Sequence, residues 1–86
     1  MNITFSGKYT VNHQTFGINF EAIVDGLQVV CLVSTDALQD IDPSSAHNTV
    51  VQQFLANQSS FEAIAKMKIR AGSTRPVVIT SSDVRA

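Results

Sequence analysis

The sequence predicts an α+β fold in which an antiparallel sheet packs in two layers against two or three helices. Two alternating apolar segments flank a single Asp25-Gly26 pair, helical apolar spacing follows within residues 46–71, and a β-branched segment comes last at residues 77–80. The 86 residues, 44% of them hydrophobic, suffice for one domain and are too few for two. We therefore expect residues 1–86 to form a single α+β domain.

A β-hairpin centred on Asp25-Gly26 is the best-defined element. Gly adopts positive φ without steric cost and Asp tolerates it, so this dipeptide favours a two-residue turn. In the strand before the turn, which we expect to start near Thr15, alternate residues share one apolar face, namely Phe16, Ile18, Phe20 and Ala22. The strand after the turn is apolar on both faces, so it should be central and either covered on both sides or in contact with a partner.

Two further strands are expected to join this hairpin. Ile3 and Phe5 alternate with polar neighbours and predict a short N-terminal strand that ends at Ser6-Gly7. The β-branched residues 77–80 predict a C-terminal strand that returns to the sheet. A turn is expected at Ser81-Ser82-Asp83, with residues 84–86 frayed.

Helices are predicted between the hairpin and the last strand. Ser34 or Thr35 is placed to cap a short helix over residues 35–40, which Asp42-Pro43 ends. Ser44 or Ser45 is then expected to cap a second helix, whose apolar stripe consists of Val50, Val51, Phe54 and Leu55.

The apolar stripe continues in phase as though one helix covered residues 46–71. A straight helix of that length would measure about 39 Å, which exceeds what a compact chain of this size covers. Ser59 and Glu62 have the spacing of a capping box, so we expect a break or a sharp kink between Asn57 and Ser60. Gly72 is expected to follow the end of the last helix.

Composition limits where the protein works and what it binds. The longest apolar run is far too short to span a membrane, and the N-terminus lacks the apolar core of a signal peptide. Cys31 is the single cysteine, which is typical of a reducing compartment, so we expect a cytoplasmic protein. The net charge of −1 argues against nucleic-acid binding, although residues 1–43 are mainly acidic and residues 44–86 mainly basic.

The reactive side chains form no recognisable catalytic or metal-binding motif. Cys31 lies in an apolar strand, which disfavours the thiolate and suggests a buried core residue. His13 falls in a turn and His47 is expected in the first turn of a helix, without the spacing of metal ligands. We therefore expect no catalytic residue, no cofactor and no metal, and a small enzyme or ligand-binding protein that uses these three side chains is an alternative.

The basic residues near the C-terminus offer a second alternative. Lys66, Arg70 and Arg75 could bind an anion or, weakly, a nucleic acid. Lys68 lies near the middle of the apolar stripe, where it could extend its ammonium group past the core, pair with a carboxylate of the acidic half, or mark a charged position in an interface.

Three segments together resemble a known family: FxAxVDGLQVVCLVSTDAL at residues 20–38, VVQQFLANQSSFEAIAKMKI at residues 50–69 and VVITSSDV at residues 77–84. This order of motifs is similar to domain-of-unknown-function family 1488, and the likeness covers nearly the whole chain. The resemblance implies a stand-alone bacterial α+β domain, with no activity, cofactor or catalytic residue to carry over. The family has Arg where this chain has Gln58, so a site built on that Arg is not implied here.

The function that these observations favour is a non-enzymatic interaction module, regulatory in role, that forms a homodimer or binds an unidentified protein. The chain has more apolar positions than two short helices can cover, and the expected interface residues are Val30, Leu32, Val50 and Val51. An apolar face of the sheet or an uncovered strand edge would form this interface.

Overall fold

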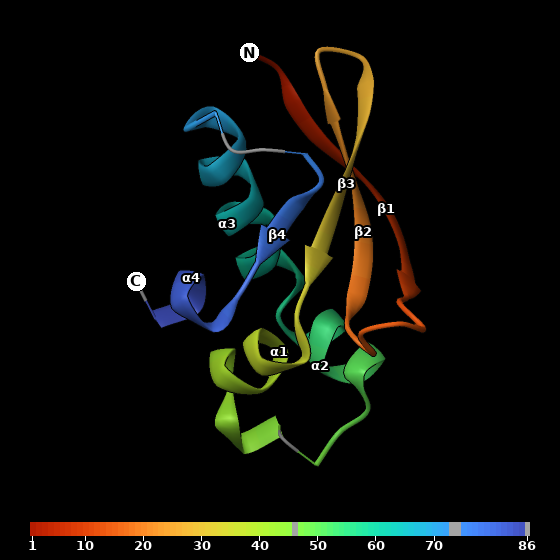
Figure 1. Cartoon of the computed structure of the whole chain (residues 1–86), viewed down its shortest axis with the longest axis vertical. Helices are drawn as coiled ribbons and strands as arrows, with labels where there is room; N and C mark the ends of the chain where they lie inside the picture. The colour runs from red at the N-terminus through yellow and green to blue at the C-terminus, as the bar shows by residue number, and fades with distance from the viewer. Residues whose placement is uncertain (46, 73–74, 86) are drawn as a thin grey trace.

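The computed structural model describes residues 1–45, 47–72 and 75–85. Four strands form one sheet in the order β1 (Ile3–Val11), β2 (Ile18–Val24), β3 (Leu27–Val33) and β4 (Val77–Ile79). β1, β2 and β3 are antiparallel neighbours, and β4 pairs in parallel with β3 (Figure 1). The predicted α+β class is confirmed, whereas the prediction of an entirely antiparallel sheet is wrong for the last strand.

The direction of β4 follows from the path of the chain through the helices. After β3 the chain forms α1 (Thr35–Ile41), a 3-10 turn η1 (Pro43–Ser45), α2 (Val50–Ala56) and α3 (Gln58–Arg70). In Figure 1, α3 carries the chain back along the sheet to the end where β3 begins. β4 therefore runs in the same direction as β3 and pairs with its second half, as strands joined through helices do.

The β2–β3 hairpin forms as predicted. Asp25 and Gly26 both adopt positive φ, +51° and +85°, in the tight turn between Val24 and Leu27. Asn2 holds this turn, because its N–H donates to the Asp25 carboxylate at 2.8 Å and its carbonyl accepts from the Asp25 N–H at 2.9 Å. The turn is thus tied to the start of β1.

β1 is longer than predicted. The sequence suggested that it ends at Ser6-Gly7, but pairing with β2 resumes at Tyr9 opposite Phe20 and continues to Val11. The register shifts between Phe5 and Tyr9, and Gly7 has a φ of +84° within this bulge. Gly7 therefore marks a bulge inside the strand and not its end.

The short helix after β3 forms as predicted, with Ser34 as its cap. The Ser34 hydroxyl oxygen accepts from the Ala37 N–H at 3.1 Å. α2 begins later than expected, because Thr49 and not Ser44 or Ser45 provides its cap. Thr49 and Gln52 form a capping box there. Ala46, where the predicted helix began, lies outside the described residues.

The expected break near Asn57 is present, but its chemistry differs. α2 ends at Ala56 and α3 begins at Gln58, with Asn57 between them at φ −126°. The predicted Ser59–Glu62 capping box is wrong, because Ser59 already lies inside α3 and the Glu62 carboxylate accepts from the Gln58 side chain at 3.3 Å. Gly72 follows α3 as expected, and its N–H donates to the Ile69 carbonyl.

The last described residues form a helix that the sequence did not predict. α4 (Ser81–Arg85) replaces the expected turn and frayed end, and Ala86 lies outside the described residues. The Asp83 carboxylate accepts from the Thr80 N–H at 2.8 Å, which stabilises the first turn of this helix. Four helices thus accompany the sheet in the described part of the chain, where two or three were expected.

An aromatic cluster lies in the core between the sheet and the helices. Phe54 of α2 is fully buried, with its ring centroid 5.3 Å from that of Phe20, 5.5 Å from that of Tyr9 and 6.0 Å from that of Phe61. The face of β2 that alternation predicted is the buried one, formed by Ile18, Phe20, Ala22 and Val24. Helices therefore cover only one face of the sheet in the described structure.

Candidate interaction surface

The face of the sheet that points away from the helices, called here the outer face, carries its own row of apolar side chains. Cross-strand partners share a face, so the pairing of Asn19 with Leu32 and of Leu32 with Val78 places these three side chains side by side. Val30 lies two residues before Leu32, and Ile23 lies diagonally across from Val30. We call Ile23, Val30, Leu32 and Val78 the outer apolar patch.

The members of this patch are accessible to solvent. Val30 is 50% exposed and Val78 is 43% exposed, while Ile23 and Leu32 are half-buried by their neighbours. β3 is central, as predicted, but the helices do not cover both of its faces, so that alternative is wrong. The second alternative, that its outer face meets a partner, stays a prediction.

A shallow depression adjoins the outer apolar patch. It has a volume of about 320 Å³ and is lined by residues of β1, β2 and β3, namely Lys8, Tyr9, Thr10, Asn19, Phe20, Glu21 and Val30. Lys8 and Glu21 bring one positive and one negative charge to it, and the Glu21 carboxylate accepts a hydrogen bond from the Gln28 side chain. The depression is open to solvent and carries no net charge.

Neither edge of the sheet is a good template for another strand. β4 is three residues long, and β1 is interrupted by its bulge, where Lys8 lies. Short strands, bulges and lysines are the features by which proteins protect sheet edges from pairing. Of the two surfaces that the sequence left open, the outer face is therefore the better candidate.

The four predicted interface residues do not form one surface. Val30 and Leu32 lie on the outer face, whereas Val50 and Val51 belong to α2 and pack half-buried against the core. Part of the apolar excess that the sequence indicated is therefore used in packing between α2 and the core. Val78 completes the outer apolar patch and was not predicted, because its exposure depends on the direction and pairing of β4.

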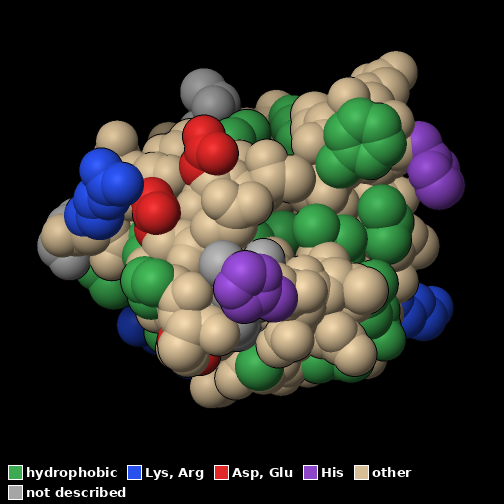
Figure 2. All heavy atoms as spheres, turned by 90° about the horizontal axis from the view of Figure 1, so that it is seen from below, with side chains coloured by type: hydrophobic (Ala, Val, Ile, Leu, Met, Phe, Trp, Pro, Cys, Tyr) green, Lys and Arg blue, Asp and Glu red, His purple; other side chains and the backbone are tan. Residues whose placement is uncertain are grey.

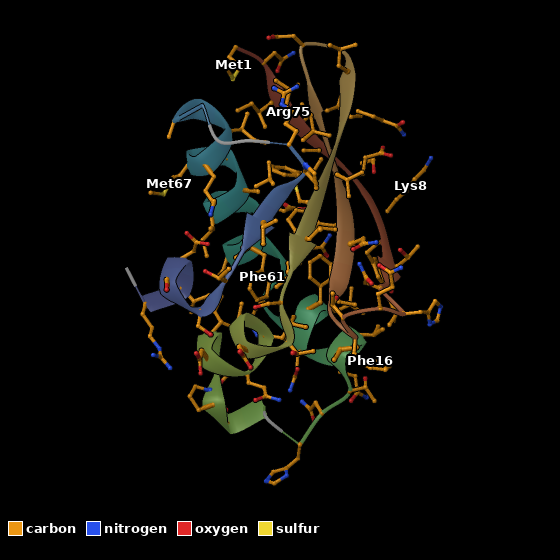
Figure 3. The ribbon with its side chains drawn as sticks, viewed as in Figure 1. Met1, Lys8, Phe16, Phe61, Met67 and Arg75 are labelled. Carbon is orange, nitrogen blue, oxygen red and sulfur yellow. The ribbon has the colours of Figure 1, made fainter. Side chains whose placement is uncertain are left out.

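Phe16 is a second exposed apolar residue that the sequence misplaced. It was expected on the buried face of a strand, but it precedes β2 in a turn with φ +61° and is 66% exposed. Asn12 holds this turn, because its side-chain oxygen accepts from the Gln14 and Thr15 N–H groups. Figure 3 shows Phe16 at the end of the molecule near α2, and Figure 2 shows hydrophobic side chains gathered on that side of the surface.

The predicted basic residues are exposed or half-buried and are not gathered in a pocket. Lys66 and Arg70 lie one turn apart on α3, whereas Arg75 precedes β4 at the end of the molecule that carries Met1 (Figure 3). No described feature adds to them as an anion site, and anion binding stays a prediction. Lys68 forms an ion pair of 2.8 Å with Asp83, so it does pair with a carboxylate, but one from the C-terminal half of the chain.

Cys31, His13 and His47 differ in their surroundings and form no recognisable catalytic site. Cys31 is fully buried on the inner face, and this burial raises the pKa of its thiol to about 11, although a hydrogen bond with the Ala22 backbone acts in the opposite direction. His13 and His47 are exposed, and His47 lies in a turn before α2 and not within a helix. The described residues contain no group of three or more His, Cys, Asp or Glu that could hold a metal ion.

Among the described helices, none has the length and hydrophobicity needed to cross a bilayer.

Comparison with known proteins identifies the family. Searches among curated proteins and among solved structures gave no match. Residues 3–79 match the family described as "Protein of unknown function (DUF1488)", which confirms the resemblance seen in the sequence and includes all four strands. The chain therefore belongs to the DUF1488 family.

Proposed function

We propose that this protein is a non-enzymatic interaction module, a single domain of residues 1–86, that self-associates through the outer face of its sheet. The observation that carries the proposal is the outer apolar patch on a sheet covered by helices on its other face. Exposed apolar side chains that adjoin one another favour contact with another protein surface.

A second copy of the chain fits this face by charge. The outer face carries Lys8 and Glu21, one charge of each sign, beside the apolar patch. A symmetric dimer brings identical faces together, so a face with net charge would repel its copy, and this face has none. The chain as a whole also has a net charge of only −1, which adds little repulsion between copies.

The size of the face indicates a weak dimer. Strands about 4.8 Å apart and about seven residues long give a face of roughly 20 Å by 20 Å. Two such faces bury roughly 800 Å² in total, below the about 1,200–2,000 Å² of stable specific interfaces and in the range of weak, transient ones. We therefore expect a reversible dimer in the micromolar range, and Cys31, the single cysteine, is consistent with a cytoplasmic setting.

Light scattering coupled to size-exclusion chromatography tests the proposal. Loaded from about 1 µM to about 500 µM, the protein should shift from monomer toward dimer. Val30→Lys and Val78→Lys should each move this shift to at least tenfold higher concentration, because each places a positive charge in the apolar patch.

Met67→Lys is the matched control, because Met67 is 71% exposed on α3, on the other side of the sheet. It should leave the association unchanged. A monomer throughout the concentration range, or equal loss of association in all three variants, would argue against the outer face as the interface.

A further inference from the structure

α4 docks mainly on α1 and more lightly on β4, without burying any of its own side chains. The helix has five residues, and none of its side chains is buried. Val84 packs half-buried against the core, and the remaining side chains are more polar or more exposed. An isolated helix of this length is unstable in water, so α4 depends on its docking against α1 and β4 for its structure.

Two ion pairs connect α4 to two different helices. The Asp83 carboxylate lies 2.8 Å from the Lys68 ammonium of α3, and the Arg85 guanidinium lies 3.0 Å from the Asp40 carboxylate of α1. The Asp83 and Lys68 side chains are each about one quarter exposed, at 25% and 28%, and the Arg85 side chain is 73% exposed. Charges this accessible are screened by salt.

The packing between α3 and α4 is incomplete. A hollow of about 290 Å³ lies there, lined by Ile64, Met67, Lys68, Asp83 and Val84. Met67 is 71% exposed, so this hollow is a surface groove between the two helices and is open to solvent.

From these contacts we infer that α4 is an electrostatic latch, which detaches as a unit while the sheet and the other helices stay folded. The Lys68–Asp83 and Arg85–Asp40 ion pairs set the population of the detached state, so added salt increases it. Detachment removes the wall of the hollow that Asp83 and Val84 form, and it exposes Ile64 and the surface of α1 on which α4 rests. This inference concerns the helical layer and does not depend on association through the outer face.

Native-state hydrogen exchange measured by NMR tests the latch at individual amides. The Asp83 and Val84 N–H groups of α4 donate to the carbonyl of Thr80, the residue just before this helix, and the Ser34 N–H donates to the Ile79 carbonyl of β4. If α4 detaches alone, Asp83 and Val84 exchange at least about 100-fold faster than Phe20 in the central sheet, and Ser34 stays protected.

Salt and one substitution then test the role of charge. Raising NaCl from about 0.05 M to about 1 M should speed exchange at Asp83 and Val84 by about two- to fivefold and leave Phe20 unchanged. Lys68→Met keeps most of the aliphatic stem and should speed exchange at Asp83 and Val84 to a similar extent in low salt. Lys66→Met is the control, because it removes a charge from the same helix but from neither of these two ion pairs, and it should leave the exchange rates unchanged.

Three results would overturn the inference. Equal protection of Asp83 and Phe20 would mean that α4 opens only with the whole molecule. Exchange at Asp83 as fast as in an unfolded peptide would mean that α4 is not docked. Exchange that responds neither to salt nor to Lys68→Met would mean that the ion pairs do not hold the latch, and the salt series on the unmodified chain gives this answer even if the variant folds poorly.

Discussion

Substitution of Gly17 by Ala tests how tightly the turn between β1 and β2 packs on the end of β3. A Cβ atom on Gly17 would lie 2.0 Å from the Val33 carbonyl oxygen and 3.2 Å from its carbonyl carbon. Real Cβ atoms essentially never approach another heavy atom within 3.0 Å. The backbone of the turn or of β3 would therefore have to move by about 1 Å, and packed interiors resist such shifts.

The atoms that would collide with this Cβ belong to the backbone of β3, which pairs with a strand on each side. Val33 is opposite Ile18 in β2 and opposite Ile79 in β4, so moving it disturbs both strand pairs. Overpacking costs typically 1–3 kcal/mol, and because no flexible side chain can yield here, we expect about 3 kcal/mol of lost unfolding free energy. For a chain of 86 residues this corresponds to a Tm about 15 °C lower.

Thermal and urea unfolding followed by circular dichroism would measure this loss. Gly26→Ala is the matched control, because a Cβ atom there meets nothing within 4 Å and the cost is confined to the positive φ of +85°. We expect the control to lose about 1 kcal/mol. If Gly17→Ala is no more destabilising than Gly26→Ala, the reasoning from the close approach to Val33 is wrong.

Further predictions concern the core, one cap and two titrating groups. Phe54→Ala removes a fully buried ring that touches three others, and urea unfolding should show a loss of about 3–5 kcal/mol, against less than about 1.5 kcal/mol for the conservative Phe54→Leu if the site repacks. Thr49→Ala removes the cap of α2 and should cost about 1 kcal/mol in the same assay, whereas no loss would mean that the capping box contributes nothing. Burial raises the pKa of the Cys31 thiol to about 11, which favours the protonated thiol in the folded state, so the stability that this provides is present below the unfolded pKa of about 8.5 and decreases as pH rises toward 11. At pH 8 a disulfide reagent should therefore label Cys31 at least about 100-fold more slowly in native protein than in urea, and equal rates would contradict its buried position. Burial alone would raise the pKa of Asp83, but hydrogen bonds from Lys68 and Thr80 together with the Lys68 charge outweigh it and lower that pKa, so the stabilisation is present above the ordinary value of about 3.9 and is lost as pH falls through the lower folded value. In urea unfolding, Asp83→Asn should accordingly be less stable than the unmodified chain at about pH 6 and equally stable at about pH 2. A difference in unfolding free energy that persists in acid would point to another cause.

The parts of the fold that local chemistry determines could be predicted from the sequence. The Asp25-Gly26 turn and the alternation in β2 depend on neighbouring residues alone, and both are present in the structure. Ser34 also caps the helix that was expected after β3. Where several residues of the same chemistry compete, the sequence did not distinguish them, as with Ser44 and Thr49 before α2.

The parts that depend on tertiary context could not be predicted. Nothing in residues 77–80 encodes which strand they join or in which direction, so the parallel pairing of β4 and the exposure of Val78 were missed. Lys68 was given the correct kind of partner from the wrong half of the chain, because charge counts do not tell which helices are neighbours. Alternation placed Val30 and Leu32 together on one face of their strand, because it needs no such context, but the sequence left open whether that face is covered or meets a partner.

Isotope-filtered NMR on a mixture of labelled and unlabelled chains tests face-to-face association most directly. At high concentration we expect methyl groups of Val30, Leu32 and Val78 to show nuclear Overhauser contacts to protons of the other copy, because these side chains form the outer apolar patch. Contacts between copies that involve only Phe16 or Met67, or no contacts between copies at all, would contradict it.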